Sequence, residues 1–225
     1  LDPQELGRNY PPTLGIIADA KVFAAQLLGA LGLREQRGTA KLHHQYSEWR
    51  AEVAAWRAEW EAHVRPNFSK RTTPLRPEYV VDSLQKVLPD DAILTCDSGV
   101  HHNWFMQFWE ARQPQAMLNT WGFSAMGFGV SGILGAKLAA PDRPCLAVCG
   151  DGGFVMTPHV LATAVEYDIP AVWLVWNNYS WAAIRDIQYG MFGGHEIGTG
   201  FYAGPKREPY SPDFAAMARS YGVEG

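Results

Sequence analysis

The sequence contains few cysteines, a modest share of charged residues and no excess of positive charge. Three of its 225 residues are cysteine, charged residues make up 19%, and the formal net charge at pH 7 is −4. This balance gives no basic surface for nucleic acid or an anionic membrane. No apolar run approaches the length that spans a bilayer, and from these residues we expect no signal peptide. We therefore expect neither a nucleic-acid-binding nor a membrane-spanning protein.

The cysteines that are present, Cys96, Cys145 and Cys149, fall in or beside stretches predicted to be buried strands. We expect reduced thiols and hence a cytoplasmic protein. Hydrophobic residues reach 47%, which supplies ample material for a core in a chain of this length. The composition therefore predicts one soluble domain with an additional arm.

The most informative motif is Gly150-Asp151-Gly152, because Asn178, the second residue of an Asn-Asn pair, stands 27 positions after its acid. Short apolar runs precede both polar groups, at 145–149 and 171–176, and each is typical of a buried strand. Between the runs, apolar residues recur at helical spacing. A strand, crossover helix and parallel strand bring both strand ends to the same edge of a sheet. We therefore expect Asp151 and Asn178 to be neighbours in space.

An acid and an amide at such an edge suit a divalent cation that carries a diphosphate. Magnesium prefers hard oxygen ligands, and Asp151, Asn178 and a nearby main-chain carbonyl supply them. Gly152 and Gly153 let backbone amides approach the diphosphate oxygens. Each half of the pattern alone is explained by a tight turn or a polar strand end. Together, at this spacing, they predict a site for thiamine diphosphate and Mg²⁺.

The chain from about Leu75 onward resembles the diphosphate-binding domain of thiamine-diphosphate enzymes, specifically the acetolactate synthase-like family. Residues 97–104, Asp-Ser-Gly-Val-His-His-Asn-Trp, resemble the segment in which a glycine and a histidine reach the cofactor's diphosphate. The resemblance implies these contacts for Gly99 and His101. The glutamine that usually precedes that histidine is Val100 in this chain.

A second resembling segment is 120–129, Thr-Trp-Gly-Phe-Ser-Ala-Met-Gly-Phe-Gly, which is similar to the stretch that grips the aminopyrimidine ring. It implies that Met126 wedges the cofactor into its bent shape and that Ser124 supplies a main-chain contact. The resemblance also implies that the main-chain carbonyl of Ser180 joins Asp151 and Asn178 as a metal ligand. The full implied set of cofactor-binding residues is Gly99, His101, Ser124, Met126, Gly150, Asp151, Gly152, Gly153, Asn178 and Ser180.

The fold that the resemblance implies is α/β, a parallel sheet flanked by helices, with a helical N-terminal arm. Residues 1–20 look like the C-terminal end of the family's middle domain, whose final strand and turn correspond to 1–10. Residues 21–74 are predicted as the helical arm and linker, and 75–225 as a diphosphate-binding domain that is C-terminally incomplete. We therefore expect the chain to be part of a longer polypeptide.

The arm is predicted to contain helices over 20–33 and 40–64, with a linker over 66–77. In the second helix, Trp49 and Trp56 are one heptad apart and Trp60 follows one turn later, so the three indoles are expected to share a face.

The active site implied by the resemblance is shared between subunits. In relatives, a glutamate on the pyrimidine-binding domain of a partner subunit promotes deprotonation of the cofactor, and no residue of this chain matches it. We therefore expect a homodimer or homotetramer, and no catalysis by this chain alone. Family members often carry FAD on the middle domain, and the sequence leaves flavin dependence open.

The reaction is indicated by the segment after Asn178. Acetolactate synthases carry a Gln-Trp pair in the following helix, and the position of that Trp is Ile187 here. The pattern Asn-Asn-x-Ser-Trp is closer to decarboxylases and carboligases of 2-oxo acids and aldehydes. Ile184 and Ile187 form either an apolar wall for the substrate or part of the core. His195, in a glycine-rich stretch that approaches the substrate in the family, is a further candidate.

We therefore expect a thiamine diphosphate- and Mg²⁺-dependent lyase or transferase that cleaves or forms a carbon-carbon bond next to a carbonyl, on a 2-oxo acid. The alternatives are an aldehyde lyase or carboligase of the benzaldehyde lyase type, and a non-catalytic cofactor-binding subunit. Fold alone does not choose among these chemistries.

Overall fold

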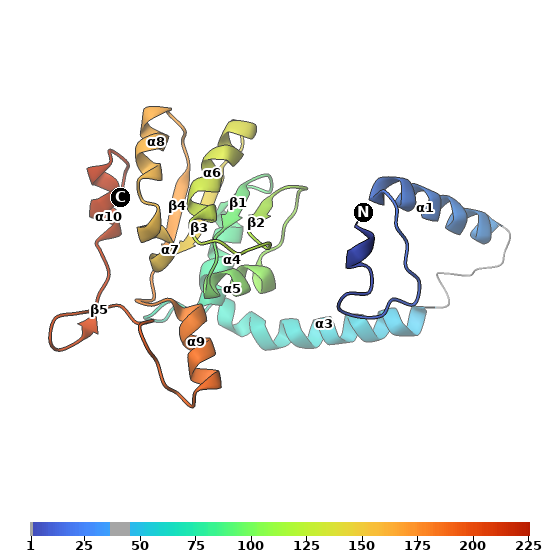
Figure 1. Cartoon of the computed structure of the whole chain (residues 1–225), viewed down its shortest axis with the longest axis horizontal. Helices are drawn as coiled ribbons and strands as arrows, with labels where there is room; N and C mark the ends of the chain where they lie inside the picture. Colours follow the sequence, from blue (N-terminus) through green and yellow to red (C-terminus); the bar gives the residue numbers. More distant parts are fainter. Residues whose placement is uncertain (1, 37–45) are drawn as a thin grey trace. The chain divides into compact units, whose positions relative to one another are not determined.

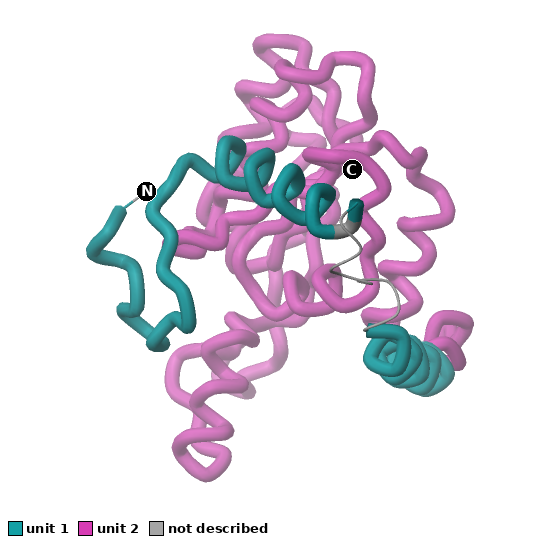
Figure 2. The backbone as a smooth tube through the Cα atoms, turned by 90° about the vertical axis from the view of Figure 1, so that its right-hand side faces the viewer, with its two compact units in different colours: residues 1–63 teal, residues 64–225 magenta. Residues whose placement is uncertain are grey.

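A computed structural model gives the positions of residues 2–36 and 46–225. The chain divides into two units, Leu1–His63 and Val64–Gly225, which are coloured separately in Figure 2. The boundary that the sequence predicts between arm and main domain, at 74/75, stays a prediction. None of the described helices combines the length and apolar content that a membrane crossing requires.

The first unit contains a 3-10 helix, η1 (Pro3–Glu5), the helix α1 (Ala20–Gln36) and most of α3 (Ser47–Phe68), which ends in the second unit. Residues 2–10 contain no strand, so the expected strand at the amino end is wrong. Asp2 instead caps η1, with its Oδ1 accepting the Gln4 N–H at 2.9 Å. A strand forms only where a partner accepts its main-chain hydrogen bonds, and the sequence does not reveal such a partner.

The predicted helices of the arm are present, with changed ends. The residues 40–45, where the second helix was expected to begin, lie outside the described ranges. At the other end α3 continues through Pro66 to Phe68, which shortens the predicted linker. Trp49 and Trp56 meet edge to face, with ring centroids 5.5 Å apart, as their shared helix face predicts.

The second unit is built on a parallel sheet of four strands, in the order β2-β1-β3-β4 (Figure 1). The strands are β1 (Ile93–Cys96), β2 (Met117–Asn119), β3 (Cys145–Gly150) and β4 (Val172–Trp176). The predicted strand, crossover helix and strand are β3, α8 (Val160–Glu166) and β4. The expected α/β fold is therefore confirmed.

Alternation along β3 gives the sheet an apolar cluster on each face. Cys145, Ala147 and Cys149 pack with one set of helices, and Leu146 and Val148 pack with another. The first set is α6 (Phe128–Ala139), α7 (Asp151–Met156), α8 and α10 (Phe214–Ser220), and the second is α4 (Pro77–Val87) and α5 (Val100–Phe108). All three cysteines are free and buried, as expected.

After β4 the chain forms α9 (Ala182–Met191) and a short antiparallel pair, β5 (Tyr202–Ala203) and β6 (Glu208–Pro209). Since β1, β3 and β4 run in the same direction, the polypeptide leaves all three strands at one edge of the sheet. That edge places the segments before α5, α7 and α9 close together, and this is where ligands of open α/β sheets bind.

Candidate functional site

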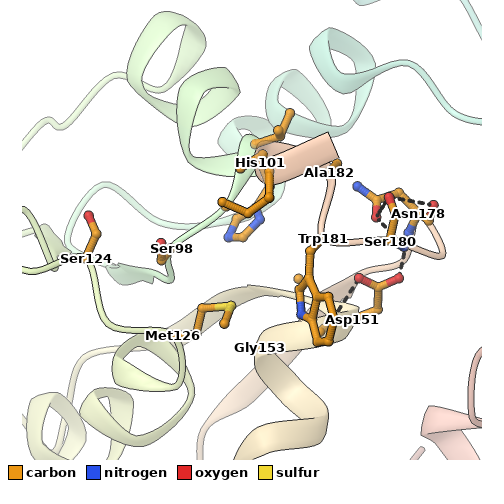
Figure 3. A pocket seen from close by; sticks show the side chains of 16 residues that line it. Ser98, His101, Ser124, Met126, Asp151, Gly153, Asn178, Ser180, Trp181 and Ala182 are labelled. Atoms are coloured by element: carbon orange, nitrogen blue, oxygen red, sulfur yellow. Dashed lines mark hydrogen bonds between the residues drawn. The ribbon is translucent and has the colours of Figure 1, made fainter. Parts of the chain in front are cut away.

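A pocket of about 440 Å³ lies at the carboxyl edge of the sheet (Figure 3). All ten residues that the sequence predicts for cofactor binding line it. The other lining residues are Ser98, Val100, Trp181, Ala182, Ala183 and Ile184. Four stretches that are distant in sequence, 98–101, 124–126, 150–153 and 178–184, thus form one cavity.

Asp151 and Asn178 are neighbours, as their strand context predicts. The Asn178 N–H donates to Asp151 Oδ2 at 3.2 Å, and the Gly152 N–H donates to Oδ1 at 2.8 Å. Asp151 is only 2% exposed. Burial raises the pKa of this carboxyl, while hydrogen bonds from main-chain amides, including those of Gly152 and Asn178, oppose the rise. Main-chain donors thus hold the carboxylate at the pocket.

Asn178 and Ser180 are joined to each other beside this carboxylate. Asn178 Oδ1 accepts hydrogen bonds from the Ser180 N–H and the Ser180 hydroxyl, each at 3.2 Å. The donor set is therefore one carboxylate, one amide oxygen and a nearby main-chain carbonyl. In the described ranges no three His, Cys, Asp or Glu side chains gather as a metal-binding group. One carboxylate with neutral oxygens fits Mg²⁺ better than it fits a metal that prefers several nitrogen or sulfur ligands.

Gly152 and Gly153 cannot carry side chains in this arrangement. A β-carbon on Gly152 would overlap the indole nitrogen of Trp181, and one on Gly153 would lie 2.5 Å from Asp97 Oδ2. The main chain after β3 is therefore bare where it meets the pocket, which suits close approach of a ligand to backbone amides.

His101 presents an unpartnered polar atom at the pocket. It is 3% exposed, and among the described residues its Nε2 has no hydrogen-bond partner. Burial, with a smaller effect from His102, lowers the pKa of His101 to about 4 against 6.5 ordinarily, despite a hydrogen bond to the Asp97 main chain. His101 is therefore neutral at physiological pH. Gly99, immediately before α5, has φ 151°, which a side chain would strain.

Two further cofactor candidates come from the segment before α6, and Gly150 ends β3 at the pocket. Met126 extends toward the pocket interior and Ser124 lies at its far side (Figure 3). Met126 is 39% exposed, and Ser124 holds a left-handed backbone with φ 50°. This segment is open to solvent, in contrast to the buried residues around Asp151.

Asp97 does not line the pocket but holds two segments that form it. The sequence pattern did not predict a role for this residue. It is fully buried, and its carboxylate accepts the N–H of Gly127 at 2.9 Å and that of Gly129 at 3.2 Å. A β-carbon on Gly129 would lie 2.7 Å from the Asp97 nitrogen. Asp97 thus ties the end of β1 to the start of α6. The feature of the sequence that could have pointed to Asp97 is its place directly after a buried strand and before Ser-Gly.

Of the three residues predicted to contact the substrate, only one lies at the pocket. Ile184 lines the pocket, whereas Ile187 and His195 do not. Ile184 is 52% and Ile187 54% exposed, so neither is a core residue in this chain. His195 is exposed, in the loop after α9. That loop is held by Gln188, whose side chain exchanges two hydrogen bonds with the main chain of Ile197.

A buried acid, an asparagine and bare glycines at the carboxyl edge of a parallel sheet are the arrangement with which α/β domains of cofactor-dependent enzymes bind phosphate groups. The family model "Thiamine pyrophosphate enzyme, C-terminal TPP binding domain" matches residues 97–225. The chain belongs to this family, as its motifs predict.

Proteins with similar sequences include an acetolactate synthase subunit and a protein named as a decarboxylase. The acetolactate synthase large subunit of Haemophilus influenzae is 27% identical over 228 residues, covering 100% of this chain and 37% of the relative. The protein named "Probable 2-ketoarginine decarboxylase AruI" of Pseudomonas aeruginosa is 31% identical over 223 residues, covering 99% of this chain and 36% of the relative. The chain thus spans little more than a third of these proteins.

A solved structure shares the fold. The thiamine diphosphate-dependent 4-hydroxybenzoylformate decarboxylase of Rhodococcus jostii RHA1 superposes with a TM-score of 0.60 and 27% identity. The match covers 67% of this chain and 27% of that one.

Proposed function

We propose that this chain holds thiamine diphosphate through Mg²⁺ in an enzyme that cleaves or forms a carbon-carbon bond next to a carbonyl. The observation that carries the proposal is the direct contact of Asp151 with Asn178 in a pocket lined by all ten predicted residues. The cofactor supplies a nucleophilic carbon and an electron sink for this chemistry.

Three oxygens hold the cation in this proposal: the Asp151 carboxylate, the Asn178 amide and the Ser180 carbonyl. The amides of Gly152 and Gly153 and the neutral ring of His101 contact the diphosphate. Burial of Asp151 strengthens its attraction for the cation, because less water screens the charge there.

A 2-oxo acid is the proposed substrate. Two of the similar proteins are decarboxylases by name, acting on 2-ketoarginine and 4-hydroxybenzoylformate, and both of these compounds are 2-oxo acids. Ala183 and Ile184 give the pocket an apolar wall near the start of α9. The wall also suits an aldehyde, so release of carbon dioxide is the assay that separates decarboxylation from aldehyde ligation.

We further propose that the site is completed by the pyrimidine-binding domain of a partner subunit in a homo-oligomer. The support is the exposed apolar segment beside the pocket, in which Trp121 is 64% and Phe123 104% exposed. Large apolar side chains gathered at a pocket rim are typical of an interface.

The test is calorimetric titration of thiamine diphosphate into the full-length protein, with Mg²⁺ or with a chelator. We expect metal-dependent binding by the wild type, and about a hundredfold or greater loss in Asp151→Ala, because the pocket's one carboxylate is removed. Asp142→Ala, at an exposed position between α6 and β3, is the matched control and should bind normally. Absence of binding by the wild type with Mg²⁺ would overturn the proposal.

A further inference from the structure

Trp181 forms one wall of the pocket. Its main-chain N–H donates to the Thr199 carbonyl at 2.9 Å, and its ring meets Phe201 edge to face, with centroids 4.9 Å apart. A second cavity of about 470 Å³ is also lined by Trp181 and Asp151. The indole therefore lies between two cavities and is fixed by contacts on its backbone and its ring.

The nitrogen-bearing edge of this indole lies over Gly152. A β-carbon on Gly152 would overlap both Nε1 and Cδ1 of the ring. Figure 3 shows the indole nitrogen on the side that faces the pocket interior. Indole N–H is a donor only, and no residue in the described part of the chain accepts a hydrogen bond from Trp181 Nε1. Although Trp181 is 39% exposed, its contacts with Thr199 and Phe201 thus direct a donor at the place where the bare main chain of Gly152 meets the pocket.

The lining offers no positively charged side chain to an anion, so a neutral N–H donor would contribute to anion binding there. The lining residues include no lysine and no arginine, and its histidine is neutral. An anion in this pocket is therefore held by the cation and by uncharged N–H groups. A hydrogen bond from a neutral donor to a charged acceptor is stronger than one between neutral groups.

We propose that Trp181 is a diphosphate-binding residue, whose indole N–H donates a hydrogen bond to a diphosphate oxygen above Gly152. This inference rests on the proposed function and deepens it. The ring closes the cofactor pocket toward the second cavity, and its contact with Phe201 keeps the donor in place.

The test compares Trp181→Phe, which keeps an aromatic ring and loses the N–H, with the wild type. We expect the affinities for thiamine diphosphate and for inorganic pyrophosphate, each with Mg²⁺, to fall about tenfold, since hydrogen bonds to charged groups carry more free energy than neutral ones. Trp60→Phe, the same change on α3 and outside the pocket, should bind as the wild type does. Circular dichroism checks that each variant is folded.

A second measurement reads the donor directly in the full-length wild type. With ¹⁵N-labelled tryptophan, the indole N–H resonance that is missing from Trp181→Phe should move downfield on addition of magnesium pyrophosphate. Wild-type binding without this movement, or unchanged affinity in Trp181→Phe, would overturn the role of Trp181 and leave the cofactor site standing. Failure of the wild type to bind either ligand would instead overturn the proposed function.

Discussion

The two ends of the pocket differ in how firmly the protein holds their side chains. At the ends of β3 and β4, Asp151 and Ser180 are 2% and 3% exposed and are fixed by hydrogen bonds to neighbouring residues. At the start of α9, Ile184 of the pocket lining is 52% exposed. The loop that follows is tied to α9 by the side chain of Gln188 and by the hydroxyl of Tyr189, which donates to Glu196.

This difference separates what the sheet determines from what loops determine. Parallel strands in register bring the residues that directly follow them close together at one edge of the sheet. Residues on α9 depend on contacts that vary more easily without disturbing the core. The cofactor end is therefore expected to be sensitive to single changes, and the substrate end tolerant.

Among changes to polar residues at or behind the pocket, the strongest effect on stability is expected for Asp97→Asn. The carboxylate accepts hydrogen bonds from the N–H groups of Gly127 and Gly129. In the variant, the side-chain NH₂ group would face one of these two N–H groups, and neither could accept. Leaving such a buried group unsatisfied should lower the free energy of unfolding by about 2–3 kcal/mol, measured by urea denaturation. Asp213→Asn, at the exposed N-cap of α10, is the control and should change it by less than about 0.5 kcal/mol, because Asn caps helices about as well as Asp. Equal losses would contradict the special role of Asp97.

A pH dependence from His101 is the next effect. Its pKa is about 4 in the folded protein against 6.5 ordinarily, so between these values the unfolded chain binds more protons. The free energy of unfolding should therefore fall as the pH drops below about 6.5, by up to about 1.4 kcal/mol per pH unit. Urea denaturation at several pH values, for the wild type and His101→Gln, measures this. His101→Gln should lack the contribution of His101 to the pH dependence of the free energy of unfolding. Identical slopes in the two proteins would contradict this contribution.

The smallest effect is expected for Ile184→Ala. Since the side chain is 52% exposed, its loss should change the free energy of unfolding by no more than about 0.5 kcal/mol. Ile133→Ala, the same change at a fully buried position of α6, should cost about 2–5 kcal/mol. Affinity for thiamine diphosphate should stay within about threefold of the wild type, while the preference among 2-oxo acids shifts. A large loss of cofactor affinity would show that the two ends are not independent.

The sequence predicted the parts of the site that follow from short-range pattern. Two apolar runs with a helical stretch between them define neighbouring parallel strands, so the meeting of Asp151 with Asn178 follows from topology. The exposure of Ile184 and Ile187 did not follow, because helical spacing gives a face but not what covers it.

The role of Asp97 depends on glycines that are distant in the sequence. Gly129 and Gly153 reach its carboxylate or main chain only after α6 and α7 have packed on the sheet. A single acid after a strand carries no such information by itself. The Trp181 donor was likewise visible only once the ring's direction was known.

The sheet order also has a consequence for handling the protein. β4 pairs with β3 on one side, and no strand in the described ranges pairs with its other side. Val172 at its start is 61% exposed, and an unpaired apolar strand edge is a template for addition of another chain. We expect this edge to favour self-association of the chain, and Val172→Lys to reduce it, as measured by light scattering.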